Sequence, residues 1–230
     1  MNKKRIPLAS VHNVRDLGGY PIGAKNMTRW GVFLRSADLS DITDCDRDKL
    51  FDYGIRTIIN LKAVGESSNP IENDKRFCYR HIPLFDDFEK VVEFSKKYNG
   101  NGYWAIIKVY SPRIKAIFDL IANRLDDGGV LFHCFAGKDR TGIIAMLLLL
   151  LAGVSALDIL ADYMVSVIYV RPVVEKLHEP LRDIHIFPDE VEAIIKEIAD
   201  NYKGMENFLK DIGVSSGDIE KIKRRFICSD

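Results

Sequence analysis

The segment from Val130 to Val154 constrains the fold more than any other part of the chain. It begins with the short apolar stretch Val130–His133, which predicts a buried strand. A loop with one glycine follows, and the apolar run Ile143–Val154 predicts a buried helix, since it is too short to span a bilayer. We therefore expect a strand and a helix, joined by a tight loop, at the centre of the fold.

Short strands and helices alternate along the rest of the chain. Further strands are predicted at Val32–Arg35, Thr57–Leu61 and Tyr79–Pro83. Helices are predicted at Cys45–Tyr53, Ile106–Leu125, Thr141–Ala152, Ala156–Val165, Asp189–Asn201, Met205–Ile212 and Gly217–Phe226. This order predicts an α/β fold with a central mixed, mainly parallel sheet flanked by helices, and a helix-rich C-terminal half.

The domain organisation is expected to be simple. A length of 230 residues without a long linker predicts a single domain over residues 1–230. Within it, residues 86–126 are expected to form a helical insertion that could act as a lid over a site. The turn Asn99–Gly102 is then either a plain surface loop or the hinge of that lid.

Composition excludes several classes of function. The 33 Lys and Arg residues balance 33 Asp and Glu residues, so nothing draws the whole molecule to nucleic acid or into a membrane. The four cysteines form no CxxC pair, so we predict reduced thiols, no metal site and no cofactor. No apolar segment follows the basic start Lys3–Arg5, so a cytoplasmic location is expected unless a signal has been removed.

The predicted loop has the residues of a phosphate-binding site. A strand-to-helix turn aims backbone N–H groups and the positive end of the helix dipole at one point, which suits a phosphate dianion. Gly137 permits a backbone conformation that other residues resist, and Arg140 can hold two phosphate oxygens at once. The predicted substrate-binding residues are Phe135, Ala136, Gly137, Lys138, Asp139 and Arg140.

Two of these residues have alternative interpretations. Lys138 either attracts substrates with several phosphates or is an ordinary solvated lysine. Phe135 either lines the pocket wall or packs in the core, as aromatic residues after strands commonly do.

Cys134 is the candidate nucleophile. The positive environment of the loop favours its thiolate form, which can attack phosphorus. His133 ends an apolar strand, so we expect it to be buried and to orient the loop, and the Thr141 hydroxyl is expected to donate to the sulfur. The alternative is a buried structural cysteine, but that role would not require Gly, Lys, Asp and Arg within the next six positions.

The leaving group needs a proton, for which the chain offers two sources. Asp139 lies inside the loop and needs no folding assumption to be close to the substrate. Asp86 and Asp87 follow a predicted strand and could lie on a movable loop. Structural roles are also open: Asp139 could form an ion pair that fixes the loop, and Asp86 or Asp87 could be a helix N-cap.

The sequence His133–Gly142, HCFAGKDRTG, resembles the active-site loop of the protein tyrosine phosphatase superfamily, whose signature is HCx5R. In this fuller form it is similar to the atypical bacterial tyrosine phosphatases of the PtpB and LipA types. Asn13–Tyr20 is similar to their NxRDLGG stretch, Phe33–Leu39 to their yRSaxL stretch, and Met205–Ile227 to their closing helices. The matches extend over nearly the whole chain, and only the loop is highly specific.

The resemblance implies a tyrosine-phosphatase-like fold, Asp139 as the acid, and phosphotyrosine substrates, with phosphoserine, phosphothreonine and phosphoinositides in several members. One departure is Asn60-Leu61-Lys62, where the family often has Asp-Leu-Arg. If that Asp and Arg brace the loop, their support is expected to be weaker here. Arg15 and Asp16 are expected either to pair with each other or to face the site.

The sequence therefore predicts a phosphomonoester hydrolase that acts through a phosphocysteine intermediate. The expected partners are a phosphorylated protein or a phosphoinositide as substrate, without nucleic acid or stable membrane insertion. The alternative is a catalytically silent phosphate-binding module on the same fold. The presence of both Cys134 and Arg140 argues against that alternative.

Overall fold

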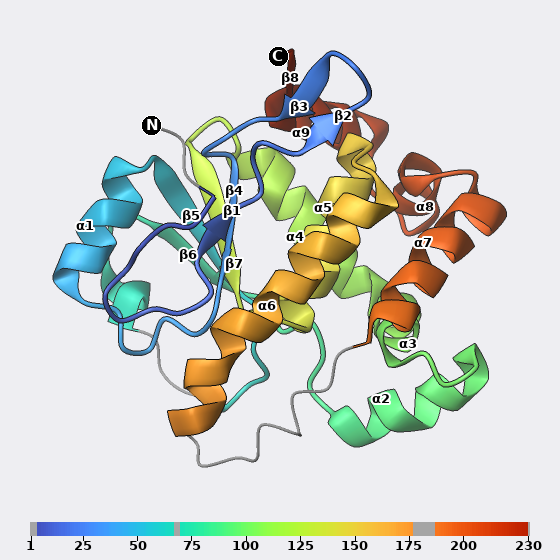
Figure 1. The fold of residues 1–230 in the computed structure, drawn as a ribbon, viewed down its shortest axis with the longest axis horizontal. Coiled ribbons are helices and arrows are strands. Elements are labelled where there is room, and N and C mark those ends of the chain that lie inside the picture. The colour runs from blue at the N-terminus through green and yellow to red at the C-terminus, as the bar shows by residue number, and fades with distance from the viewer. Residues whose placement is uncertain (1–3, 67–69, 177–186, 230) are drawn as a thin grey trace.

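The computed structural model describes residues 4–66, 70–176 and 187–229, and a five-stranded sheet lies at its centre (Figure 1). The strand order is β1 (Arg15–Asp16), β4 (Phe33–Ser36), β7 (Gly129–His133), β5 (Ile55–Asn60) and β6 (Cys78–His81). Four of these strands, β4, β7, β5 and β6, are parallel, whereas β1 runs antiparallel to β4. The predicted central mixed, mainly parallel sheet is confirmed.

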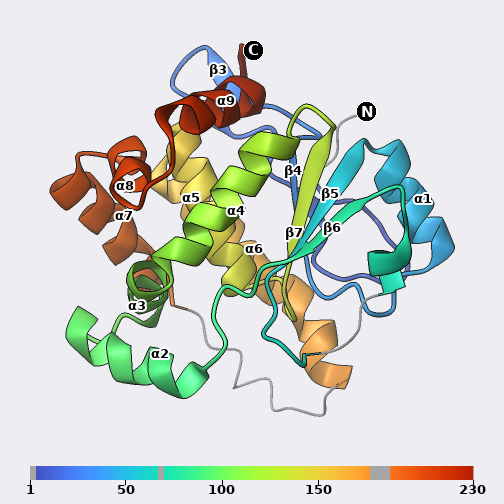
Figure 2. The same ribbon diagram turned by 180° about the vertical axis from the view of Figure 1, so that it is seen from behind.

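Helices cover both faces of this sheet (Figures 1 and 2). One face carries α1, and the opposite face carries α4 and α5. The described helices are α1 (Asp44–Asp52), α2 (Phe88–Ser95), α3 (Gly102–Val109), α4 (Ser111–Arg124), α5 (Arg140–Ala152), α6 (Ala156–Lys176), α7 (Pro188–Tyr202), α8 (Met205–Asp211) and α9 (Ser216–Phe226), with short 3-10 turns at Pro70–Asn73 and Lys96–Tyr98.

Two hydrophobic clusters fill the two sides of the sheet. Successive residues of a strand point to opposite faces, and β7 shows the division clearly. Val130 and Phe132 belong to the larger cluster, which includes Phe118 of α4, whereas Leu131 belongs to the smaller cluster, which includes Leu50 of α1. The strand β7, which leads into the loop at residues 134–139, is therefore packed on both faces.

The helix α5 is the apolar helix that the sequence predicts. Its residues from Thr141 to Leu149 are all buried, and it packs against β4, β7 and three other helices. It ends at Gly153, whose φ of 87° is left-handed and whose N–H donates to Leu150 O at 3.0 Å. A helix buried on every side fixes the position of the loop that precedes it.

Two predicted helices differ from those observed. The single helix expected at Ile106–Leu125 is two helices, α3 and α4, which meet at Tyr110. Pro112 lies in the first turn of α4, where proline favours a helix start and cannot continue a preceding helix. The helix expected to end at Val165 continues to Lys176.

The predicted lid range, residues 86–126, has two different parts. The helix α4 belongs to the core, because Ile114, Ile117, Phe118 and Ile121 are fully buried. The helices α2 and α3 lie apart from the sheet, with α3 beside α7 (Figure 1). Movement of α2 and α3 as a lid stays a prediction.

A second, three-stranded sheet joins the two ends of the chain and was not predicted. It consists of β2 (Pro21–Ile22), β3 (Asn26–Thr28) and β8 (Ile227–Ser229), all antiparallel. Strands of two or three residues are too short to show the alternation of apolar and polar residues from which strands are predicted.

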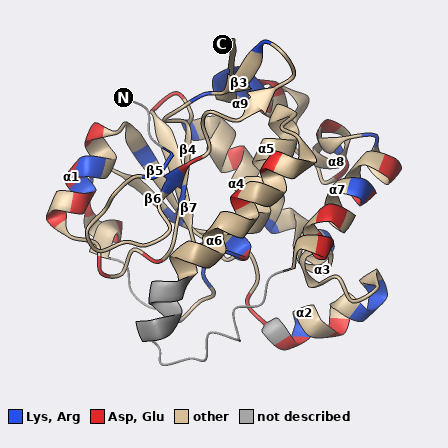
Figure 3. Cartoon of the chain, in the orientation of Figure 1, with Lys and Arg blue, Asp and Glu red and all other residues tan. Residues whose placement is uncertain are grey.

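Charged residues of both signs are mixed along the helices (Figure 3), as the equal numbers of acidic and basic residues lead one to expect. Figure 3 shows basic and acidic positions interspersed along α1, α2 and α7. Over the described ranges, no helix combines the length and the apolar character needed to cross a bilayer.

Candidate active site

The loop from Cys134 to Asp139 joins β7 to α5 at the carboxyl ends of the parallel strands, where ligands bind in sheets of this kind. Cys134 is 3% exposed, and Arg140 is the first residue of α5. Gly137 has a φ of 66°, and a Cβ at this position would lie 2.4 Å from the carbonyl oxygen of Ser36. The left-handed backbone and the close approach to β4 both require glycine here.

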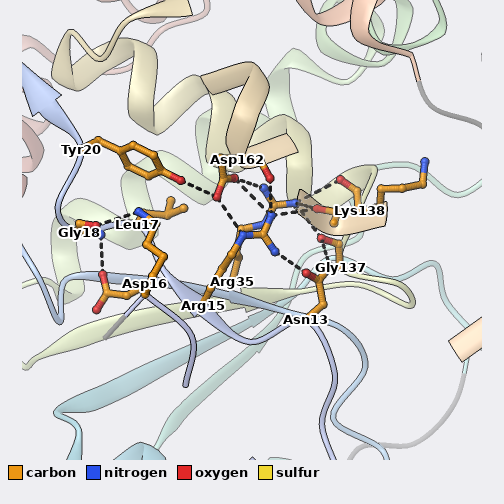
Figure 4. Close-up of polar contacts among 12 residues, drawn as sticks. Asn13, Arg15, Asp16, Leu17, Gly18, Tyr20, Arg35, Gly137, Lys138 and Asp162 are labelled. Atoms are coloured by element: carbon orange, nitrogen blue, oxygen red, sulfur yellow. Dashed lines mark hydrogen bonds and ion pairs between the residues drawn. The ribbon is translucent and has the colours of Figure 1, made fainter. Parts of the chain in front are cut away.

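The carbonyl groups of the loop are held from outside the loop (Figure 4). The Asp38 N–H lies 2.9 Å from the carbonyl oxygen of residue 135, and Asn13 Nδ2 lies 3.0 Å from those of residues 136 and 137. Arg35 Nη2 lies 2.7 Å from the oxygen of residue 137 and 3.3 Å from that of residue 138. In a trans peptide the N–H points opposite to the C=O, so the N–H groups of residues 136–139 point into the loop. The loop is thereby arranged as an anion-binding cradle.

Arg140 has a carboxylate partner that was not predicted. Its Nη1 and Nη2 lie 2.8 and 2.9 Å from the two carboxylate oxygens of Glu66, a bidentate pair. Burial lowers the pKa of Arg140, but the hydrogen bond to Glu66 and the nearby Cys134 sulfur raise it overall. Burial raises the pKa of Glu66, and its bonds to Arg140 lower it overall. Both groups therefore stay charged, and the pair fixes the guanidinium beside Cys134.

Asp139 is bound by two donors through one oxygen. The Tyr103 hydroxyl donates to Asp139 Oδ1, and Lys138 Nζ lies 2.5 Å from the same atom. The Tyr103 hydroxyl also lies 2.8 Å from that of Tyr163. Burial and the charge of Asp139 raise the pKa of Tyr103, which keeps its hydroxyl protonated as a donor. Both contacts are made to Oδ1 of Asp139, so one carboxylate oxygen is held on the side of Tyr103 and Lys138.

Asp86 and Asp87 have partners outside the loop. Asp86 forms an ion pair with Arg113, which lowers the pKa of Asp86. Asp87 is the N-cap of α2, and its Oδ1 accepts from the Lys90 N–H at 3.1 Å. The helix-cap interpretation of Asp87 thus describes this structure, whereas Asp139 is the carboxylate within the loop.

His133 and Thr141 flank the loop from the interior. Both are fully buried, as expected for His133. Its Nδ1 lies 3.9 Å from Asp38 Oδ1, and burial lowers the pKa of the imidazole, so this histidine is neutral near pH 7. Among the described residues, Thr141 Oγ1 has no hydrogen-bond partner, so the expected bond to the Cys134 sulfur is not formed in this structure.

The two residues with alternative interpretations lie in contrasting environments. Phe135 is 40% exposed and is not a core residue. Lys138 is only 7% exposed, and its Nζ lies 5.9 and 5.7 Å from the ring centroids of Tyr163 and Phe187. Lys138 is therefore not an ordinary solvated lysine.

The departure at residues 60–62 does not leave the loop unsupported. Lys62 is fully buried, and its Nζ lies 2.6 Å from Asp38 Oδ1. Asn60 Oδ1 accepts from the Lys62 N–H at 2.9 Å, and Asn60 Nδ2 donates to Tyr79. Because the backbone of Asp38 binds the loop carbonyl of Phe135, the Lys62–Asp38 pair braces the loop.

Arg15 and Asp16 do not pair with each other. Arg15 Nε lies 2.9 Å from Asp162 Oδ1, behind the loop. Asp16 accepts from the N–H groups of Gly18 and Gly31 and from the Tyr53 hydroxyl. Arg15 belongs to the surroundings of the site, whereas Asp16 fixes a turn.

A cavity of about 560 Å³ opens beside the loop. Four charged residues contribute to its lining: Glu66, Lys138, Asp139 and Arg140. Its wall is largely apolar and comes from Phe85, the α2–α3 segment and Phe187, with Val91, Val92 and Ile106 among its residues. A phosphate in the cradle would have its organic part in this cavity.

The chain is similar in sequence to known proteins, in some cases over most of its length. A profile described as the tyrosine phosphatase family matches residues 6–228. A tyrosine-protein phosphatase of Nostoc commune is 35% identical over 217 residues, 84% of this chain and 74% of that protein. The triple specificity protein phosphatase PtpB of Mycobacterium tuberculosis is 28% identical over 116 residues, 41% of this chain and 42% of that protein. The crystal structure of TpbA from P. aeruginosa matches at a TM-score of 0.36 and 15% identity, over 61% of this chain and 80% of the TpbA chain.

The mainly parallel sheet, with an anion-binding loop at the carboxyl ends of its strands, defines the class as an α/β protein suited to bind phosphate. The chain belongs to the tyrosine phosphatase family, which confirms the predicted family and class of enzyme.

Proposed function

We propose that this protein hydrolyses phosphotyrosine in proteins through a covalent phosphocysteine on Cys134. The observation that carries the proposal is the loop itself, in which the outward carbonyl groups of residues 135–138 turn the peptide N–H groups toward Cys134 and Arg140. Such fixed donors stabilise the charge of a transferring phosphoryl group without reorganisation.

The reaction has two steps, transfer of the phosphoryl group to Cys134 and hydrolysis of the phosphocysteine. The Cys134 thiolate attacks phosphorus while the bond to the substrate oxygen breaks, and Asp139 gives its proton to that oxygen. Water then attacks the phosphocysteine, Asp139 accepts a proton from it, and phosphate and the thiolate are released. Arg140, oriented by Glu66, holds phosphate oxygens in both steps.

The cavity supports an aromatic substrate. Its apolar wall would cover the face of a phenyl ring, and Phe85 lies within reach of Arg140, whose guanidinium is 5.2 Å from the ring centroid. The volume of about 560 Å³ also leaves room for an inositol ring, or for the backbone of a phosphoserine or phosphothreonine peptide, which supports these as second substrates. The name of the mycobacterial relative, a triple specificity phosphatase, points the same way.

Turnover of an aryl phosphate with and without a chelator tests the proposal. The protein should release phosphate equally in both cases, Cys134→Ser should abolish turnover, and the exposed-thiol control Cys45→Ser should leave it unchanged. Mass spectrometry of a quenched reaction should show one phosphate added on Cys134. Binding of phosphate without any turnover would instead favour the silent binding module.

A panel of phosphotyrosine, phosphothreonine and phosphoinositide substrates then tests the substrate class. A higher kcat/KM for phosphotyrosine is expected. A clear preference for the phosphoinositide would overturn the choice of substrate and leave the chemistry intact.

A further inference from the structure

Two buried arginines lie behind the phosphate loop and share one carboxylate (Figure 4). Arg35 Nη1 lies 2.5 Å from Asp162 Oδ2, and Arg15 Nε lies 2.9 Å from Asp162 Oδ1. The hydroxyl of Tyr20 also donates to Asp162, and that of Ser166 accepts from Arg15. None of these hydroxyl contacts adds a negative charge.

Within this contact set the two guanidinium groups carry one more positive charge than Asp162 balances. Lys4 lies farther out and does not contact the loop; burial lowers its pKa to about 8, and Asp162, Asp16 and Asp158 act against that shift. At the front of the loop the cations are matched, since Lys138 pairs with Asp139 and Arg140 pairs with Glu66. A buried charge without a counter-ion is costly, so an excess at this place favours an anion in the cradle, either the Cys134 thiolate or a bound phosphate.

Arg35 is the member of this cluster whose guanidinium contacts the loop backbone from behind. Its Nη2 donates to the carbonyl oxygens of Gly137 and Lys138, at 2.7 and 3.3 Å. A cation on a carbonyl oxygen polarises the peptide group and strengthens its N–H as a donor on the other side. The affected N–H groups are those that face the cradle.

Asn13 completes the contact with the loop. Its backbone has a left-handed φ of 57°, which asparagine tolerates better than most residues. Its Oδ1 accepts from Arg15, which sets the orientation of the amide, and its Nδ2 then donates to the carbonyl oxygens of Ala136 and Gly137. Arg15 thus acts on the loop through Asn13.

We propose that Arg35 and Asn13 are positioning residues for phosphate binding, which fix and polarise the loop N–H groups from behind while Arg35 supplies the excess positive charge. The inference rests on the proposed function, because it concerns the same phosphate site. Neither residue touches the reacting atoms. A purely structural role, in which both residues only tie the N-terminal segment to α6, predicts lost stability without a specific loss of phosphate affinity.

The test measures binding of inorganic phosphate to the Cys134→Ser protein by isothermal titration calorimetry, so that no turnover is needed. In this background Arg35→Gln should weaken phosphate binding about tenfold or more, as should the isosteric Asn13→Asp, which turns an acceptor toward the loop carbonyls. Arg35→Lys keeps the charge without the fork and should recover part of the affinity. Arg35→Gln leaves Asp162 paired with Arg15, so no lone buried carboxylate is created.

Asp46→Asn is the matched control. Asp46 is fully buried and binds the N–H groups of Ala9 and Ser10, away from the loop. Its replacement should lower the urea midpoint and leave the phosphate affinity of the folded protein within about twofold.

Three outcomes would count against the inference. It is overturned if folded Arg35→Gln and Asn13→Asp proteins bind phosphate as tightly as their parent. It is also overturned if Asp46→Asn loses as much affinity as they do, because the loss then reflects general destabilisation. Should the Cys134→Ser parent bind no phosphate at all, the proposed phosphate site is itself wrong and the inference falls with it.

Discussion

Removal of the Glu66 carboxylate tests how Arg140 works. The two residues form a bidentate pair at 2.8 and 2.9 Å, which uses Nη1 and Nη2 and leaves Nε and the other guanidinium hydrogens for phosphate. Glu66→Gln keeps the shape of the side chain but loses its charge and one of the two contacts. The Arg140 fork then turns more freely, and its contact with the transferring phosphoryl group weakens.

The magnitude follows from the geometry. Glu66 is 36% exposed and Arg140 12%, so the pair should contribute at most about 1 kcal/mol to the free energy of unfolding. The effect on the transition state is expected to be larger, at about 1.4–2.7 kcal/mol, since small misplacements of a positioning group are costly. That range corresponds to a loss in kcat/KM of about 10- to 100-fold.

The assay is steady-state hydrolysis of an aryl phosphate, with the exposed Glu72→Gln as control. Because the pKa of Glu66 lies below its ordinary value of 4.5, the pair is intact from about pH 5 upward. The loss should therefore be constant between about pH 5 and pH 7. An increase in kcat/KM for Glu66→Gln would refute the reasoning, because Glu66 would then be a competitor for the phosphate site and not an orienting group.

Three further predictions concern other parts of the molecule. Asp139→Asn should slow hydrolysis of an alkyl or unactivated phenyl phosphate about 100-fold or more and that of an activated aryl phosphate far less, and equal losses in a kinetic comparison would remove Asp139 from the acid role. Gly137→Ala should abolish most turnover and lower the thermal midpoint, because its Cβ would lie 2.4 Å from the Ser36 oxygen at a left-handed φ; an unchanged melting curve would contradict this. Burial raises the pKa of Asp46, but hydrogen bonds from Ala9, Ser10 and Thr43 lower it overall to about 2 from an ordinary value of 3.8. Its contribution, on the order of 2 kcal/mol, is present above about pH 4 and lost as the pH falls toward 2, so urea midpoints should fall more steeply with acid in wild type than in Asp46→Asn.

Features that are local in the sequence could be predicted. The strand, loop and helix around Cys134 follow one another directly, so one short segment contains both the chemistry and its structural context. The apolar run of α5 was equally clear, since such a run must be buried. Pro112 is a sequence signal for the break between α3 and α4 at Tyr110. The helical spacing of apolar residues over 106–121 nevertheless favoured one continuous helix in the prediction.

The surroundings of the loop could not be read in this way. Asn13 and Arg35 reach the loop across more than 100 residues, and their contacts depend on where β1 and β4 join the sheet. Tyr103 depends on the packing of α3 against α7. Glu66 left a weaker signal: it follows β5, a neighbour of β7 in the sheet, so the carboxyl ends of the two strands meet at one edge.

The pairing of β3 with β8 has a consequence for biosynthesis. Thr28 lies opposite Ile227, so the open edge of the β2–β3 hairpin stays uncovered until residue 227 has been synthesised. Contacts this distant in sequence form slowly and late. The nascent polypeptide therefore completes this sheet only after residues 227–229 have emerged, and a chain that stops before them would leave that hairpin edge exposed to aggregation.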